Sequence, residues 1–413
     1  MAQGGEDINA TAESVARRSY GKLIAFLAAR TRDVAAAEDA LAEAFAAALV
    51  HWPTHGVPDN PEGWLMAAAK RKAIDAYRAA KRGSQALPHL TMMTEELTTA
   101  SHGEIPDERL KLLFACAHPA IDEGVRAPLM LQTVLGFDAA AIASAFLVSP
   151  AAMSQRLVRA KTRIRESGIP FRVPEHEDLA ERLPFVLDAI YAAYAEGWSD
   201  AAGTDASARE MAGEAIWLGR LVAMLLPDEA EALGLLALML HSQARRAARR
   251  DALGEFVPLS EQDTRIWDGA MMTEAEQLLR RAATMNAIGR FQLEAAVQSA
   301  HAVRCLKGAA DWAAIVTLYD ALWDMTASPV IAINRAIAIA ETRGPLQGLA
   351  ALDAIDAGPL SQYQPYWSAR AHLLAKTGAH DAALGAYDRA IGLEIDPAIR
   401  RFLQTRKAAL ATH

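Results

Sequence analysis

Two stretches of the sequence concentrate basic side chains at helical spacing. Between Lys70 and Arg82 there are six basic residues and one acidic residue, and between Arg156 and Arg165 there are five basic residues and no acidic one. Clustered cations of this kind bind phosphate groups, although the same pattern also occurs on ordinary solvated helix faces. Charge alone therefore makes both stretches candidates for nucleic-acid contact and leaves the solvated-face interpretation open.

The second basic stretch lies within a pattern typical of a helix-turn-helix. Ser149 suits the cap of a helix and Pro150 its first position. Core-spaced residues follow in the same helix: Met153, Leu157 and Ala160. The side chains left to face a ligand are Ser154, Gln155, Arg156, Arg159, Lys161 and Arg163. Because Gln and Arg read base edges and cations bind phosphates, the pattern favours duplex DNA binding over a plain helical hairpin, despite Leu147 where most such turns have Gly.

The first basic stretch belongs to a helix that we expect to begin at Asn60 and Pro61, a capping residue followed by proline. The preceding segment, residues 51–61, is rich in proline and is expected to be a loop. Cations beside flat rings suit a single strand whose bases are unstacked. The candidates for such contacts are Lys70, Arg71, Lys72, Arg78, Trp52 and His55. A solvated helix face beside a structural loop is the simpler interpretation of this stretch by itself.

Residues that support catalysis or metal binding are sparse. Cys116 and His118 have the spacing of half a metal site, but no second pair follows at ligand spacing, so a place in an apolar core is the better interpretation. The sequence has no glycine-rich phosphate loop, no G-x-S-x-G turn and no H-E-x-x-H helix. We therefore expect a protein without catalytic residues, metal or cofactor.

The sequence also indicates the cellular compartment of the protein. The N-terminus lacks the basic and apolar pattern of a secretory signal, and the longest apolar run, residues 233–240, is too short to span a bilayer. Cys116 and Cys305 are the only cysteines, which suits a reducing compartment. A cytoplasmic protein without membrane contact is expected.

Composition predicts an all-α protein of several domains. The chain has 413 residues, of which 52% are hydrophobic and 6% aromatic, and Ala, Leu and Ile predominate among the apolar ones. Alternating runs of β-branched residues, typical of strands, are scarce. The net charge is −8, but residues 1–174 hold 20 basic and 19 acidic residues, so the acidic excess belongs to the remainder.

The C-terminal part of the sequence repeats itself at a regular interval. Ile315, Leu349 and Ala383 are equally spaced, and several other sets follow the same register. Their spacing matches the period of about 34 residues that is the signature of tetratricopeptide repeats (TPR), which are pairs of helices. The middle repeat has Asp353 and Asp356 at positions where apolar residues are expected, so an Ala-rich bundle is the alternative to a TPR-like α-solenoid.

The order of these modules resembles extracytoplasmic-function sigma factors, a class of bacterial transcription initiation factors. Residues 12–82 resemble their region-2 domain: AEDALAEAF is similar to the polymerase-binding helix, and NPEGWLMAAAKRKAIDAYR to the helix that contacts the promoter −10 element. Residues 107–168 resemble the region-4 domain, which reads the −35 element. The GIPFRVP junction and later blocks such as GRFQLEAAVQSAHA resemble the subgroup that carries a TPR-type C-terminal extension.

The resemblance implies a role for each candidate residue. The acidic helix would bind RNA polymerase through four carboxylates, Asp33, Glu38, Asp39 and Glu43. The basic helix and the preceding loop would hold the unpaired −10 strand, and the helix-turn-helix would read the −35 duplex. Two positions depart from the family pattern, because Ala42 stands where the family usually has Gln and Arg71 where it usually has Asn.

The expected organisation has four parts: a sigma region-2 domain at 1–82, a linker at 83–106, a region-4 helix-turn-helix domain at 107–170, and a helical TPR-like extension at 171–413. The expected partners are RNA polymerase core and promoter DNA, while the acidic extension binds a protein partner or folds back on the DNA modules. The alternatives are a one-component helix-turn-helix regulator with a ligand-sensing helical domain, and a TPR scaffold without a nucleic-acid role.

Overall fold

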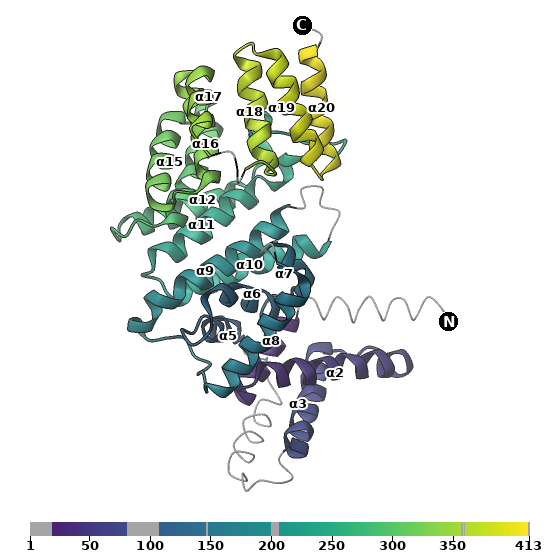
Figure 1. Cartoon of the computed structure of the whole chain (residues 1–413). Helices are drawn as coiled ribbons and strands as arrows, with labels where there is room; N and C mark the ends of the chain where they lie inside the picture. The colour runs from purple at the N-terminus through teal and green to yellow at the C-terminus, as the bar shows by residue number, and fades with distance from the viewer. Residues whose placement is uncertain are drawn as a thin grey trace. The chain divides into compact units, whose positions relative to one another are not determined.

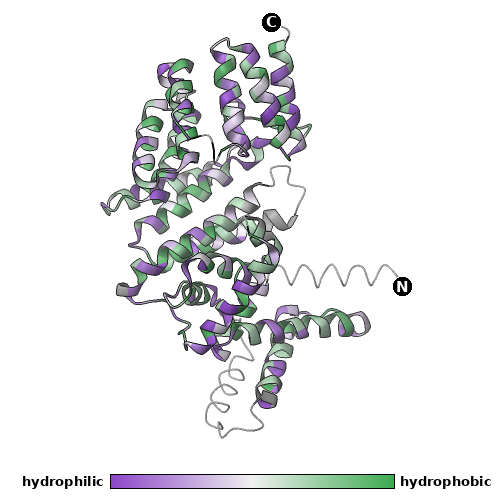
Figure 2. Ribbon diagram, viewed as in Figure 1, coloured by the Kyte–Doolittle hydropathy of each residue, from purple (hydrophilic) through white to green (hydrophobic). Residues whose placement is uncertain are grey.

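The computed structural model describes residues 19–80, 107–145, 148–199, 206–356, 358 and 360–411. Within these ranges the chain is helical and contains no β-strand, only an isolated bridge between Arg250 and Phe256. This confirms the predicted all-α fold. Figure 2 shows hydrophobic and hydrophilic residues interspersed along the helices, as expected where each helix buries one face. No helix of the described ranges is long and apolar enough to cross a membrane.

The chain divides into two compact units. The first holds residues 1–197 and 206–218, and the second holds residues 198–205 and 219–413. The described part of the first unit begins with a helix at residues 19–31, which carries no label in Figure 1. The labelled helices that follow are α2 (Val34–His55), α3 (Pro61–Ala80), α5 (Arg109–Cys116), α6 (Glu123–Thr133), α7 (Ala139–Ala145), α8 (Pro150–Glu166), α9 (His176–Ser199) and the beginning of α10 (Ala206–Leu225). The predicted linker at residues 83–106 lies outside the described part of the chain.

Three helices of the described residues form the N-terminal module, residues 19–80. The Asp33 carboxylate caps α2 by accepting a hydrogen bond from the Ala36 N–H (3.1 Å). The Asn60 side chain likewise accepts a hydrogen bond in the first turn of α3 (2.9 Å), and Pro61 begins that helix. α2 and α3 pack against each other. The largest buried side chains of the module are Leu23, Ile24, Phe26, Leu27, Leu41, Trp52 and Leu65.

α2 is longer than predicted and includes part of the segment that we expected to be a loop. It ends at His55 rather than near Val50, and Pro53 lies inside it. Trp52 explains the extension, because it continues the apolar series that recurs every three or four residues on the buried face. That series is Val34, Ala37, Leu41, Ala44, Ala48 and Trp52. Gly56, whose φ is 83°, then ends the helix.

The second module, residues 107–170, contains four helices, α5 to α8. Ser149 caps α8 by accepting a hydrogen bond from the Ala152 N–H (3.3 Å), and Pro150 takes the first helical position. The core residues predicted for α8, Met153, Leu157 and Ala160, are buried, as are Ile142 and Ala143 of α7. α7 and α8 pack against each other, while Leu147 of the turn lies outside the described residues.

Both modules and the beginning of the extension belong to the same compact unit. Gly21 lies so close to Val134 of the second module that a Cβ atom at Gly21 would overlap the Val134 carbonyl oxygen. From the extension, the Phe185 ring of α9 lies 4.5 Å from the Arg126 guanidinium of α6. A second cation–π contact joins α10 to α5. The division between compact units therefore falls within α10, not at the predicted start of the extension, whose boundary stays a prediction.

The second unit is built from neighbouring helices that pack in sequence order. Its elements after α10 are α11 (Ala230–Ala244), η1 (Arg246–Arg249), η2 (Leu259–Glu261), η3 (Thr264–Ile266), α12 (Gly269–Ala283), α13 (Arg290–Ala302), α14 (Arg304–Lys307), α15 (Trp312–Thr326), α16 (Pro329–Arg343), α17 (Pro345–Asp353), α18 (Gln364–Lys376), α19 (His380–Leu393) and α20 (Pro397–Ala411). α11 packs against α12 and α13, and from α15 onward each helix packs against the next. Figure 1 shows α18, α19 and α20 side by side.

The regular repeat in the sequence corresponds to successive helix pairs. Ile315, Leu349 and Ala383 lie in α15, α17 and α19, the first helices of three pairs. Ile315 and Ala383 are fully buried, and Leu349 packs against the apolar clusters on either side of it. The repeated apolar positions therefore face the neighbouring pairs, which is how stacked hairpins build a continuous core.

A basic cluster at residues 244–251 is part of the structure of the second unit. Arg249 donates a hydrogen bond to the Trp198 carbonyl (2.6 Å), and its guanidinium lies 4.3 Å from the centre of the indole ring. Arg250 forms an ion pair with Asp396, which precedes α20. These contacts give the cluster a structural role in joining segments that are distant in sequence.

Small residues set the spacing of helices in the second unit, and this leads to a prediction about stability. A Cβ atom at Gly348 in α17 would collide with Ala340 and would lie 2.8 Å from the Ala336 carbonyl oxygen, both in α16. We expect Gly348→Ala to lower the free energy of unfolding by about 1–3 kcal/mol, because the two helices must separate. Urea unfolding followed by circular dichroism measures this change.

Gly385→Ala is the matched control, because a Cβ atom there would meet no atom within 4 Å and the position is exposed inside α19. This change should raise stability by about 0.5–1 kcal/mol through the lower conformational entropy of the unfolded chain. Equal effects of the two substitutions would contradict the close packing of α16 and α17.

Candidate nucleic-acid and polymerase interfaces

The basic residues of α8 form two groups on different sides of the helix. Arg156, Arg159 and Arg163 lie three or four residues apart and share one side. Lys161 and Arg165 lie four residues apart and share another. Ser154 and Gln155, in the first turns, are exposed. The residues predicted to read the −35 element therefore do not form one continuous surface.

The arginine group borders a surface cavity of about 540 Å³. The other residues around this cavity are Ala120, Ile121, Asp122, Val125 and Ala160. All three arginines are exposed, and among the described residues no carboxylate forms an ion pair with them. Arg159 donates a hydrogen bond to the Gln155 carbonyl of its own helix (3.3 Å). Three guanidinium groups on one side of a helix suit phosphates or the acceptor edge of guanine.

The second group of cations faces α2. Lys161 donates a hydrogen bond to the Glu38 carboxylate at 2.6 Å, and the two side chains are only 11% and 19% exposed. Arg165 pairs with Asp33 at 3.4 Å. Lys161, a predicted DNA contact, is therefore neutralised by Glu38, and Arg165 neutralises Asp33, so two predicted polymerase contacts are paired within the protein. Arg165 is not among the predicted DNA contacts, and no local pattern indicates its pairing, because its partner lies more than a hundred residues away in the sequence.

The remaining acidic residues of α2 face solvent. Asp39 and Glu43 are exposed, and Glu43 pairs with Lys72 of α3 at 2.7 Å. Glu38 differs from them, because its burial raises its pKa and the neighbouring Lys161 opposes that shift. The outward acidic surface of α2 therefore consists of Asp39 and Glu43.

The predicted −10 cations of α3 also differ in accessibility. Lys70 is 8% exposed, and its ammonium lies 5.1 Å from the centre of the Phe26 ring. Burial lowers the pKa of Lys70, and the nearby Arg30 lowers it further. Lys70 therefore packs inside the module rather than facing a strand. The exposed arginines of α3 are Arg71 and Arg78.

The prediction that Trp52 stacks on a base is wrong for this structure. Trp52 is fully buried, with its ring in edge contact with Trp64 (5.7 Å between centres), because α2 continues through this residue and turns it toward the core. His55 is exposed as expected and stacks on His51 at 4.0 Å. The sequence predicted a loop for this segment and so did not indicate the stacking of His51 on His55; a helix makes histidines four residues apart neighbours.

Cys116 lies in the core of the second module, as the sequence analysis favoured. Its thiol lies 3.6 Å from the Thr133 hydroxyl, and burial raises its pKa to about 12. The His118 ring accepts a hydrogen bond from the Ala120 N–H (3.1 Å). Across the described residues, no group of three or more His, Cys, Asp or Glu side chains is placed to hold a metal ion.

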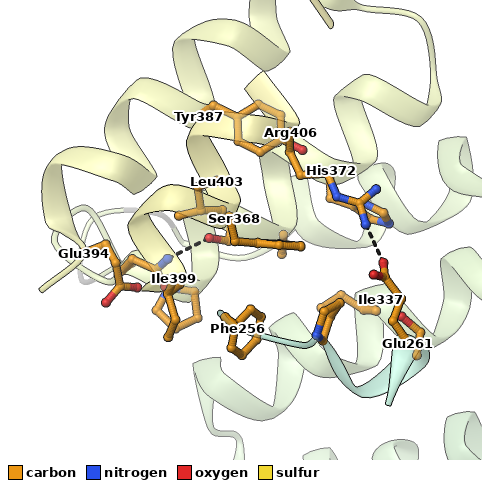
Figure 3. A pocket seen from close by; sticks show the side chains of 16 residues that line it. Phe256, Glu261, Ile337, Ser368, His372, Tyr387, Glu394, Ile399, Leu403 and Arg406 are labelled. Atoms are coloured by element: carbon orange, nitrogen blue, oxygen red, sulfur yellow. Dashed lines mark hydrogen bonds and ion pairs between the residues drawn. The ribbon is translucent and has the colours of Figure 1, made fainter. Parts of the chain in front are cut away.

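The second unit contains a cavity of about 470 Å³ that the sequence did not indicate. Figure 3 shows Phe256, Ile399 and Leu403 around this cavity, together with the ion pair between Arg406 and Glu261 (2.5 Å). A largely apolar lining with a few polar groups is typical of ligand and peptide sites. Sequence patterns missed it because its lining comes from α16, α18, α19, α20 and the segment around η2.

Comparison with known proteins identifies two parts of the chain. Residues 15–83 match sigma-70 region 2, which covers the N-terminal module, and residues 182–283 match a family of unknown function, DUF6596, which extends from α9 to α12. An uncharacterized protein of Rhizobium meliloti (strain 1021) is 37% identical over 387 residues, which is 92% of this chain and 91% of that protein. No solved structure matches the chain.

The burial of Trp52 leads to a prediction that separates stability from DNA contact. We expect Trp52→Ala to lower the free energy of unfolding by about 3–5 kcal/mol, because it leaves a large cavity under α3. His55→Ala, three residues away on the exposed side, should change it by less than about 0.5 kcal/mol. Urea unfolding of both variants checks this, and a Trp52→Ala protein as stable as the parent would contradict the assignment of Trp52 to the core.

Proposed function

The chain belongs to the same protein family as the Rhizobium meliloti relative and carries a sigma-70 region 2 domain, and on this basis we propose that it is an extracytoplasmic-function sigma factor. Such a protein binds RNA polymerase core and directs it to specific promoters. The match of residues 15–83 to sigma-70 region 2 is the observation that carries the proposal. The protein acts by binding rather than catalysis, in the cytoplasm, where its polymerase and promoter are.

The described surfaces support different roles for the two modules: contact with polymerase and the −10 strand for the N-terminal module, and contact with duplex DNA for the second. The exposed carboxylates Asp39 and Glu43 of α2 suit a contact with polymerase core. Arg71 and Arg78 of α3 and the exposed rings of His51 and His55 suit an unpaired −10 strand, since cations bind its phosphates and flat rings stack on its bases. The DNA contacts of the second module, which acts as a helix-turn-helix, come from the exposed residues of α8: Ser154, Gln155, Arg156, Arg159 and Arg163.

The C-terminal extension serves as a TPR-like partner-binding domain. Its successive helix pairs follow the repeat in the sequence, and the cavity beside Phe256 and Leu403 offers an apolar surface for a peptide segment of a partner protein. The acidic excess of this part of the sequence disfavours direct DNA contact. A one-component regulator would share the helix-turn-helix, but it would hold its operator without polymerase, and this difference separates the two functions experimentally.

Transcription in a reconstituted system tests the proposed function. Full-length protein added to RNA polymerase core should produce a run-off transcript from the promoter upstream of its own gene. Reversing both exposed charges of α2 (Asp39→Lys with Glu43→Lys) should weaken core binding by about tenfold or more, equivalent to about 1.4 kcal/mol. Co-purification with core and transcript yield measure the two effects.

Asp324→Lys, at an exposed position in α15, is the control for charge reversal and should leave both measurements unchanged. Absence of any transcript with the full-length protein, together with tight operator binding in the absence of core, would replace the sigma-factor proposal by the one-component regulator.

Salt dependence tests the assignment of DNA contacts to the arginine group of α8. Each contact with a phosphate contributes about one unit to the slope of log affinity against log salt, because binding releases condensed counterions. We expect Arg156→Ala, Arg159→Ala and Arg163→Ala each to weaken promoter binding by the holoenzyme, and to reduce this slope by about one where the side chain binds phosphate. Fluorescence anisotropy over a series of salt concentrations provides the measurement.

Arg280→Ala is the matched control, because Arg280 is an exposed arginine on α12 in the other unit. A slope that falls equally for Arg280→Ala and for the three α8 variants would show that net charge, and not the position of these arginines, determines the affinity.

A further inference from the structure

One wall of the cavity in the second unit is formed by a segment without α-helix, residues 251–262, which we call the strap. Phe256 and Glu261 of the strap line the cavity, and the helices contribute Tyr387 and Leu403 among other residues (Figure 3). Since the cavity has a volume of about 470 Å³, the strap leaves open much of the space between itself and the helices.

Ion pairs join the strap to α20. The Arg401 guanidinium lies 2.9 Å from the Glu255 carboxylate, and the Arg406 guanidinium lies 2.5 Å from the Glu261 carboxylate. All four side chains are between 41% and 53% exposed, so solvent screens both pairs. Ion pairs in such a setting exchange readily with carboxylates from another molecule.

An aromatic contact accompanies the first ion pair. The Phe256 ring lies edge-on to the Phe402 ring, with 5.3 Å between the ring centres, and both side chains are half-buried. Phe256 directly follows Glu255 in the sequence, and Glu261 comes five residues later. The strap therefore presents to α20 an apolar ring that lies between two carboxylates in the sequence.

Both ends of the strap are held by contacts that do not involve this pattern. At the beginning, Arg250 forms an ion pair with Asp396, and these side chains are only 10% and 22% exposed. Towards the end, the Arg304 guanidinium donates hydrogen bonds to the carbonyls of Leu259 and Gln262. The middle of the strap can therefore leave α20 while its ends keep their places.

The charge of α20 indicates what could replace the strap. α20 carries Arg400, Arg401, Arg406 and Lys407 and no acidic residue, although the extension as a whole has an acidic excess. A basic helix beside an apolar cavity suits an acidic partner with apolar side chains. The side chains of such a partner could also fill the space that the strap leaves open.

We propose that the strap occupies the binding site of a partner, and that this partner is an extended segment of another protein with an aromatic residue between two carboxylates. The proposal rests on the partner-binding role of the extension proposed above. The partner segment takes Arg401 and Arg406 from the strap and places apolar side chains in the cavity. Because the strap belongs to the same chain, it competes at a high effective concentration and lowers the apparent affinity for the partner.

Binding of the strap sequence to the full-length protein tests the proposal. The acidic probe is a fluorescein-labelled peptide with the sequence of residues 253–262, and the basic probe is the same peptide with Glu255→Lys and Glu261→Lys. Fluorescence anisotropy measures the affinity for each probe. The parent protein should bind the acidic probe weakly, because its own strap is closed over the site.

Charge reversal on either side of the contact should open the strap and select opposite probes. Glu255→Lys with Glu261→Lys in the protein leaves both arginines free, so the affinity for the acidic probe should rise about tenfold or more. Arg401→Glu with Arg406→Glu also opens the strap, but this variant should reject the acidic probe and bind the basic one. All four substitutions together exchange the charges, close the strap again and should weaken the binding of either probe.

Lys376→Glu with Lys407→Glu is the matched control. These lysines form ion pairs with Glu341 and Asp388 in the same unit and do not line the cavity, so the double substitution should leave the affinity for both probes unchanged. Binding of neither probe to either opened variant, or equal binding of both probes to both variants, would overturn the proposal.

A variant without a change of charge keeps the test decisive if a charge-reversed protein fails to fold. Phe256→Ala removes the contact with the Phe402 ring and leaves α20 intact. It should raise the affinity for the acidic probe by about threefold or more, because more molecules have an open strap. Circular dichroism shows which variants are folded, and an unchanged affinity in folded Phe256→Ala would contradict the proposal.

The peptide measurements separate this proposal from the sigma-factor function, because they need neither polymerase nor promoter. If the opened variants select opposite probes but the protein yields no transcript with core, the partner site stands and the sigma-factor function fails. If core and the protein produce the transcript while no variant binds either probe, the sigma-factor function stands and the partner site fails.

Discussion

A charge held between packed helices must find an opposite charge or a hydrogen-bond partner, and this requirement shapes both units of the protein. In the first unit it brings Lys161 of one module to Glu38 of the other. In the second unit it brings Arg304 to the backbone carbonyls of Leu259 and Gln262, and so fixes a segment without regular helix. An Ala-rich chain has few large side chains with which to fix the register of its helices, and paired charges supply part of that specificity.

Small residues supply the rest of the specificity with which the helices pack. Aromatics make up only 6% of the sequence, so few rings are available to fill the cores, and close approach of helices contributes to their packing. Gly21, Gly234 and Gly348 all lie where a Cβ atom would meet the backbone of a neighbouring segment. Dispersion between closely spaced backbones then replaces the contacts that rings would make. Such interfaces tolerate little change, because a single methylene group has no free space to occupy.

The sequence predicted the elements well where the signal was local. Asn60–Pro61 and Ser149–Pro150 begin helices as expected, and the regular repeat corresponds to the helix pairs from α15 onward. The prediction failed where two local signals competed. Pro53 suggested a loop, while the apolar series that ends at Trp52 required a helix, and the burial of a large ring outweighed the loss of one backbone hydrogen bond.

The residue types of the candidate site could be predicted from the sequence, but which of these side chains are exposed to solvent could not. Periodicity places Lys161 on a different side of α8 from Arg159, but only the folded chain shows that Glu38 lies opposite one side and open solvent opposite the other. Lys70 and Trp52 belong to the predicted set and are covered, since burial depends on helices far away in sequence. Pairings over such distances cannot be deduced from a single sequence.

The division of α8 into two charged sides has a consequence for how such a protein can diverge. If α8 binds DNA as proposed, substitutions on the side of Arg156, Arg159 and Arg163 would alter what is read on DNA, while those on the side of Lys161 and Arg165 would alter the contact with α2. Duplicated copies in one genome could therefore acquire new target sequences while retaining the same internal contact. A change at Lys161, by contrast, would require a compensating change at Glu38, so the two positions are expected to vary together among relatives.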